Sequence, residues 1–228
     1  AADVYGAVAS EETGEARHEA LLAQAQMLIR ASRLVDARLT LEAHTTEAGP
    51  ATEGGTGQYL LASTIQDLGG EDAAALDLYS RYALAGGPLT SYANIERAKL
   101  LATLGRGAEA EPIAAGVLAN ASVNDLGGSF SMSMGRAYLT AALPADALVW
   151  FERAASYEGF SAPSLSSQGA AKQQLGDPTW VDDYVTAITI APASGDAASL
   201  LDELDLAAVP VSAYVRGVVE YRAFRNDA

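Results

Sequence analysis

The stretch GRAYL at residues 135–139, followed by ADALVWFERA at residues 145–154, decides how this chain folds. It places one small residue, Gly135, ahead of another, Ala147, with a break at residues 142–144 between them. The apolar residues on both sides of the break recur every three or four positions, which is the spacing of one helix face and not the alternation of a strand. The stretch therefore predicts two helices joined by a tight turn.

Pairs of small residues recur along the chain, and the interval between the two members is the same in every pair. The five pairs are Ala25 with Ala37, Ser63 with Ala75, Ala98 with Ala110, Gly135 with Ala147, and Gly169 with Val181. Successive pairs follow one another at a period of roughly 34–38 residues, which is typical of repeat proteins. In such proteins each unit buries its apolar face by stacking on the next.

Small side chains also have a physical role at these positions, because a large one would hold two closely crossing antiparallel helices apart. Chance in an alanine-rich chain is the competing explanation. The coincidence of spacing, breaks and helical stripes favours the repeat.

The pattern resembles the tetratricopeptide repeat (TPR), a helix pair with small residues at these two positions. That family also has an aromatic residue or a leucine four positions after the second small residue. Leu41, Tyr79, Phe151 and Val185 match this feature, and Ala114 departs from it. The resemblance implies an all-α fold, a right-handed superhelix (solenoid) of about five to six antiparallel TPR-like helix pairs.

The resemblance divides the chain into three parts. Residues 1–17 are an N-terminal lead-in, residues 18–190 hold five TPR-like helix pairs, and residues 191–228 hold C-terminal helices. In the last part, a first helix begins at Val211 and no second helix follows it. We expect the chain to be truncated within a further repeat, with a terminal capping helix as the alternative.

Other stretches are similar to the superhelical domain of bacterial soluble lytic transglycosylases, which act on peptidoglycan outside the cytoplasm. They are YSRY at residues 79–82, GGPL at residues 86–89 and VPVSAYVRGVV at residues 209–219. The catalytic Glu-Ser pair of those enzymes has no counterpart, because no glutamate in this chain is followed by serine. The resemblance implies a non-catalytic scaffold or binding module of the cell envelope, with a lytic transglycosylase domain elsewhere in the full-length protein.

Two alternatives to this envelope module stay open. The first is a stand-alone cytoplasmic TPR adaptor that mediates protein–protein interaction by binding a peptide. The second is an enzyme in its own right, for which the sequence offers the least support.

The charge of the chain argues against several classes of partner. The formal net charge is −15 and the isoelectric point is near 4.4. Nucleic acids and anionic membranes attract cationic surfaces, so both are poor partners. The absence of cysteine excludes disulfides and thiol chemistry, and no apolar run reaches the roughly 20 residues of a membrane-spanning helix.

No catalytic or metal-binding pattern stands out in the sequence. His18 and His44, the only histidines, are distant in the sequence and fall on different expected helices, and we interpret them as solvated surface residues. The chain has neither the histidine spacing of a zinc protease nor a Gly-x-Ser-x-Gly turn around a nucleophile. We therefore predict no catalytic residue, no metal and no cofactor.

The TPR resemblance implies a binding groove, because first-helix positions line the concave face in that family. Carried over residue by residue, the groove contains Tyr92, Ile95 and Lys99 of the third unit and Met132, Arg136 and Thr140 of the fourth. Lys99 and Arg136 share a repeat position, so we expect them side by side, where they could hold a carboxylate. The alternative is that Glu96, Asp125 or another acid neutralises them. The expected partner is a protein or peptide, with peptidoglycan fragments as a further option.

Overall fold

The computed structural model describes residues 1–49, 54–120 and 126–226, and over these residues it is all-α, with thirteen helices and no strand. The chain divides into two compact units, Ala1–Val117 and Leu118–Ala228. In chain order the helices are α1 (Ala2–Glu11), α2 (Gly14–Arg30), α3 (Leu34–Ala48), α4 (Thr56–Leu68), α5 (Asp72–Leu84), α6 (Thr90–Thr103), α7 (Gly107–Ala119), α8 (Gly127–Thr140), α9 (Pro144–Glu158), α10 (Ala162–Leu175), α11 (Trp180–Ile190), α12 (Ala197–Leu206) and α13 (Ala213–Asn226).

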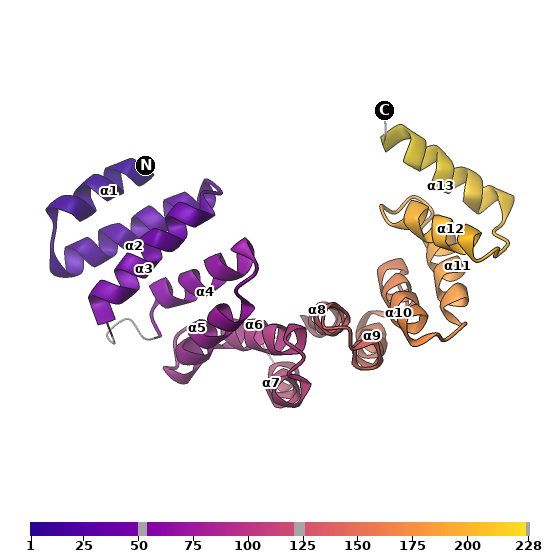
Figure 1. Cartoon of the computed structure of the whole chain (residues 1–228), viewed down its shortest axis with the longest axis horizontal. Helices are drawn as coiled ribbons and strands as arrows, with labels where there is room; N and C mark the ends of the chain where they lie inside the picture. The colour runs from indigo at the N-terminus through magenta and orange to yellow at the C-terminus, as the bar shows by residue number, and fades with distance from the viewer. Residues whose placement is uncertain (50–53, 121–125, 227–228) are drawn as a thin grey trace. The chain divides into compact units, whose positions relative to one another are not determined.

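Within each unit, helices that follow one another in the chain pack together (Figure 1). In the first unit, α2 contacts α1 and α3, α4 contacts α3 and α5, and α5 contacts α6. In the second unit, α9 contacts α8 and α10, α11 contacts α10 and α12, and α12 contacts α13. Packing between consecutive elements is typical of a repeat fold, so the predicted all-α solenoid of helix pairs is confirmed.

The small residues lie where the two helices of a pair cross. Six of the ten are alanines with 0% exposure, namely Ala25, Ala37, Ala75, Ala98, Ala110 and Ala147. A Cβ added at Gly135 would lie 2.4 Å from the ring of Phe151, and one added at Gly169 would lie 2.4 Å from the ring of Tyr184. Carbon atoms in contact are normally about 3.5–4 Å apart, so neither site has room for a side chain. The size restriction behind the repeat is therefore a packing requirement.

The fifth helix pair departs from the sequence register by one position. The register predicts Val185 as the large residue that packs on Gly169, but the ring beside Gly169 belongs to Tyr184, which is 3% exposed. The interval from Gly169 to Tyr184 is shorter by one position than the interval from Gly135 to Phe151 in the preceding pair. The connection before α11, residues 176–179, differs from residues 141–143 before α9 and is one residue longer. The second helix is therefore rotated by one position relative to the preceding pair, so the assignment of Val185 is wrong and Tyr184 packs on Gly169.

The turns within four of the pairs share one backbone conformation. A residue one or two positions after the first helix has positive φ in each of them, at Ser32 (57°), Gly105 (71°), Ala142 (56°) and Gly176 (72°). After Ala142, the N–H of Leu143 donates to the carbonyl of Tyr138 at 2.9 Å. This is a Schellman hydrogen bond, which satisfies a carbonyl that the helix end leaves open. The left-handed turn therefore forms even where the residue is not glycine.

The C-terminal helices pack onto the fifth pair. Tyr184 and Ile188 of α11 share one apolar cluster with Leu200 and Leu204 of α12 and Val219 of α13. Because these residues are buried together, α12 and α13 extend the core of the second unit beyond the predicted pairs.

Candidate functional site

The predicted groove residues of α6 share one face of that helix. Tyr92 is 55% exposed and Ile95 is partly buried. Lys99 has an ion-pair partner, because its Nζ lies 2.7 Å from the carboxylate of Glu96. That carboxylate also accepts a hydrogen bond from Gln66 Nε2 at 2.8 Å. The alternative considered from the sequence, that an acid of the chain neutralises the cation, therefore applies to Lys99.

The other predicted groove residues lie on α8, in the second unit. Arg136 and Thr140 are exposed, and Met132 is partly buried. The hydroxyl of Thr140 donates to the carbonyl of Arg136 at 3.0 Å, within its own helix. Asp125, the acid considered as a partner for these cations, lies outside the described residues. Since Lys99 and Arg136 belong to different units, their predicted pairing stays a prediction.

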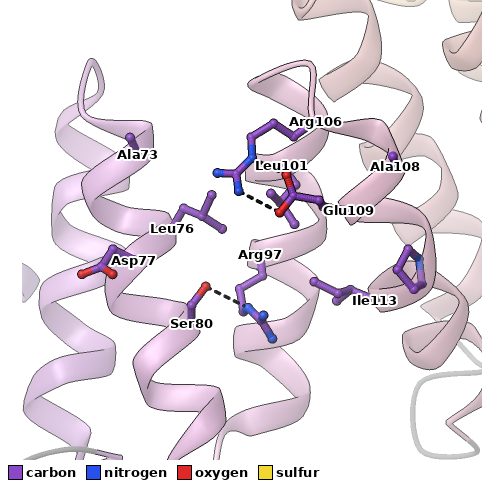
Figure 2. A pocket seen from close by; sticks show the side chains of 11 residues that line it. Ala73, Leu76, Asp77, Ser80, Arg97, Leu101, Arg106, Ala108, Glu109 and Ile113 are labelled. Atoms are coloured by element: carbon purple, nitrogen blue, oxygen red, sulfur yellow. Dashed lines mark hydrogen bonds and ion pairs between the residues drawn. The ribbon is translucent and has the colours of Figure 1, made fainter.

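A pocket of about 540 Å³, the α5–α7 pocket, lies among three helices of the first unit (Figure 2). The lining residues are Ala73, Leu76, Asp77, Ser80, Arg97, Leu101, Arg106, Ala108, Glu109, Pro112 and Ile113. More than half of these are apolar. A cavity of several hundred Å³ with apolar walls and a few polar groups is typical of ligand sites.

Arg97 of α6 supplies a positive charge to the α5–α7 pocket. Its Nε donates to Ser80 Oγ at 3.1 Å and its Nη1 donates to Asn94 Oδ1 at 2.7 Å. Both acceptors are neutral, and these two bonds use only part of the donor set of a guanidinium. Figure 2 shows the Arg97 side chain between Ser80 and Ile113. Burial lowers the pKa of Arg97 below its ordinary value.

The two carboxylates that line the α5–α7 pocket are held by other arginines. Asp77 Oδ2 lies 2.9 Å from Arg81 Nη2. Glu109 accepts hydrogen bonds from Arg106 at both of its oxygens, each at 2.8 Å. These bonds hold the pKa of Glu109 below its ordinary value. Among the residues that the structure describes, no carboxylate forms an ion pair with Arg97.

The repeat register shows why an arginine here is unusual. Arg97 directly precedes Ala98, and its counterpart in the next unit is Met134, which precedes Gly135 and is 0% exposed. The other counterparts vary, because Ala62 is 0% exposed, Gln168 is 4% exposed and Gln24 is partly buried. Arg97 itself is partly buried, so its cation loses part of its hydration. Sequence reasoning missed Arg97, because it selected residues from the face that the TPR family exposes. The signal that could have found it is a charged residue at a repeat position where the other four units have none.

The two histidines are in contact, with His18 partly buried, and His44 is not the solvated surface residue that the sequence suggests. Their rings are in edge contact with centroids 5.7 Å apart, and His44 is 7% exposed. A Cβ added at Gly57 of α4 would lie 2.4 Å from the His44 ring, so α4 covers that ring. Burial, and then the neighbouring His18, lower the pKa of His44. The surface assignment is wrong for His44 because it did not anticipate the packing of α4.

Two kinds of feature are absent from residues 1–49, 54–120 and 126–226, namely a metal-binding cluster and a membrane-spanning helix. In that part of the chain, no three His, Asp or Glu side chains are grouped so as to hold a metal ion. Over the same residues, no helix combines the length and the apolar character needed to cross a bilayer. The first unit does contain the α5–α7 pocket, which combines apolar walls with the cationic side chain of Arg97.

Comparison with solved structures shows which known proteins share this fold. No protein-family model and no curated protein matches the chain. The solved structure of MamA residues 41 to the end, from Desulfovibrio magneticus RS-1, superposes with a TM-score of 0.62 at 12% identity, over 81% of this chain and 99% of that chain. The crystal structure of YrrB, described as a TPR protein with an unusual peptide-binding site, superposes with a TM-score of 0.57 at 14% identity, over 84% of this chain and 94% of that chain. At these identities the similarity shows the fold alone, which is TPR-like.

Proposed function

We propose that this chain is a non-catalytic helical-repeat module that binds a peptide segment of a partner protein. The observation that carries the proposal is the face of α6 on which the exposed Tyr92 accompanies the Glu96–Lys99 ion pair. An aromatic ring near charged groups offers apolar contact area together with hydrogen-bonding partners, as protein-binding surfaces do. The TPR-like fold supports the proposal, because YrrB shares this fold and is described as having a peptide-binding site.

The second unit offers a corresponding face on α8, where Met132 and Arg136 occupy the repeat positions of Ile95 and Lys99, and Thr140 lies one turn beyond Arg136. Lys99 shares its positive charge with Glu96. Arg136 would supply a positive charge of its own, so an acidic peptide would be drawn toward α8.

The α5–α7 pocket favours binding over catalysis. Its hydroxyl group, on Ser80, accepts a hydrogen bond from Arg97, and a guanidinium cannot remove a proton. A serine nucleophile needs an adjacent general base, whereas the two carboxylates of the pocket are held in ion pairs.

Selection of a random-peptide phage library on the folded chain tests the proposal. We expect peptides to be enriched, and we expect Tyr92→Ala to weaken their binding about tenfold in fluorescence polarisation, as removal of an aromatic anchor does. Tyr214→Ala is the matched control, because Tyr214 lies on α13 and is 79% exposed. Failure to enrich any peptide, or equal affinity of the Tyr92 variant, would contradict the proposal.

A cell-envelope setting is a finer proposal, supported by the stretches that resemble soluble lytic transglycosylases. In the first of them, Tyr82 accepts a hydrogen bond from the N–H of Leu89 at 2.9 Å, and its ring occupies the space where a side chain at Gly87 would lie. Isothermal titration with soluble peptidoglycan fragments tests this setting. Saturable binding would support it, and no binding would favour the cytoplasmic adaptor.

A further inference from the structure

We propose that the α5–α7 pocket recognises the carboxylate of an acidic side chain that a partner peptide presents beside an aliphatic residue. The inference rests on the proposed function, because it specifies what a bound peptide carries. It assigns the recognition to Arg97, outside the predicted groove. Successive helical residues are about 100° apart around the axis, so Arg97 lies on the side of α6 opposite Tyr92 and Lys99.

Arg97 occupies a position where the next repeat unit has a buried apolar side chain. Its counterpart Met134 is 0% exposed. Arg97 is partly buried, so its guanidinium loses part of its hydration, and its bonds to Ser80 and Asn94 bring no opposite charge. Burying a charge without a counter-ion destabilises the folded state. A ligand that supplies the missing negative charge accounts for the presence of the arginine.

The α5–α7 pocket matches a carboxylate on an aliphatic body. A guanidinium can bind both oxygens of a carboxylate through parallel charge-assisted hydrogen bonds. Leu76, Leu101 and Ile113 line the pocket and supply apolar contacts. Pro112, inside α7, has no N–H, so the carbonyl of Ala108 lacks its usual helical donor.

The net negative charge of the chain does not repel an acidic ligand once that ligand lies in the α5–α7 pocket. Exposed charges are largely screened beyond a Debye length of about 8 Å at physiological salt. Within the pocket, Asp77 is paired with Arg81 and Glu109 with Arg106. The charge that a ligand meets near Ser80 is therefore that of Arg97.

Two peptides that differ at one position test the inference, namely acetyl-Ala-Leu-Glu-Leu-amide and its glutamine counterpart. Each is titrated into the full chain, and the side-chain N–H signals of Arg97 are followed by NMR. We expect the glutamate peptide to bind about tenfold more tightly, which is typical of a hydrogen bond to a charged group. Arg97→Met should abolish this preference and raise Tm, because it replaces a partly buried cation with the side chain found at Met134.

Two further variants make the result decisive. Arg97→Gln removes the charge with a polar side chain, and it should abolish the preference even if the methionine variant does not fold. Arg33→Met removes a charge from an exposed ion pair with Asp36, and it should keep the preference. Inorganic phosphate is the third ligand, and we expect it to bind more weakly than the glutamate peptide. Equal affinity for both peptides, a preference that survives loss of Arg97, or tighter binding of phosphate would overturn the inference.

The two sets of experiments distinguish failure of this inference from failure of the proposed function. If phage-selected peptides depend on Tyr92 and the test peptides do not depend on Arg97, the inference fails and the proposed function stands. Alternatively, the glutamate peptide binds through Arg97 and phage selection enriches no peptide that depends on Tyr92. In that case carboxylate recognition by the α5–α7 pocket is supported, and peptide binding on the Tyr92 face of α6 is contradicted.

Discussion

Gly135 shows how the size of one residue sets the separation of two helices. The ring of Phe151 occupies the space that a side chain at Gly135 would need, and Phe151 itself is 0% exposed. The ring cannot move aside without displacing other core side chains, because protein interiors are close-packed. The same restriction holds at Gly169, where the ring is that of Tyr184.

We therefore predict that Gly135→Ala destabilises the chain. The added Cβ would overlap a buried ring, and overpacking of this kind typically costs about 1–3 kcal/mol. Urea unfolding followed by circular dichroism measures the change in the free energy of unfolding.

Gly116→Ala is the matched control for this variant. Gly116 lies within α7 and is exposed, and a Cβ added there meets no atom within 4 Å. Alanine is the better helix former by about 0.5–1 kcal/mol, so this variant should be more stable than the wild type. A Gly135 variant as stable as the wild type would refute the close approach of α8 and α9.

At the scale of helices, the contact between His18 and His44 joins α2, α3 and α4. Burial and the neighbouring His18 lower the pKa of His44 below its ordinary value of 6.5. The folded chain therefore resists protonation of His44 at a pH where the unfolded chain accepts the proton. Nearby, a hydrogen bond from Arg17 lowers the pKa of Glu47, so Glu47 stays ionised as the pH falls through 6.5.

We predict that the first unit loses stability as the pH falls below 6.5, the ordinary pKa of histidine. Because the folded-state pKa of His44 is lowered, its contribution to stability is complete above that pH and declines below it. Urea unfolding at about pH 7.5 and about pH 5.5 measures this dependence.

His44→Gln removes the titrating group and should flatten the dependence, whereas His18→Gln should reduce it by removing a neighbouring positive charge. A first unit whose stability rises on acidification, with the wild-type histidines in place, would refute the burial of His44.

At the scale of the whole molecule, the sequence predicted the features that depend on neighbouring positions in the chain. The helix pairs were predictable because close crossings restrict residue size at regular intervals, as at Ala98 and Gly135. Tight turns were predictable where glycine marks them, as at Gly105. The shift of register that brings Tyr184 onto Gly169 was not predictable, because it depends on the backbone conformation of the turn before α11.

The candidate site was less predictable, because burial depends on helices that are distant in the sequence. Arg97 is part of the α5–α7 pocket only because α5 and α7 flank α6. His44 is buried only because α4 covers it at Gly57. Lys99 was predicted in the groove from its repeat position, but its ion pair with Glu96 depends on side-chain geometry.

Hydrogen–deuterium exchange of the whole chain, with and without a phage-selected peptide, tests most directly the claim that this repeat binds peptides through α6. That helix carries Tyr92 on one side and Arg97 on the other, so occupation of either surface should slow exchange in Thr90–Thr103. We predict slower exchange there and unchanged exchange in α13. Protection confined to other helices, with exchange in α6 unaltered by a bound peptide, would contradict the account.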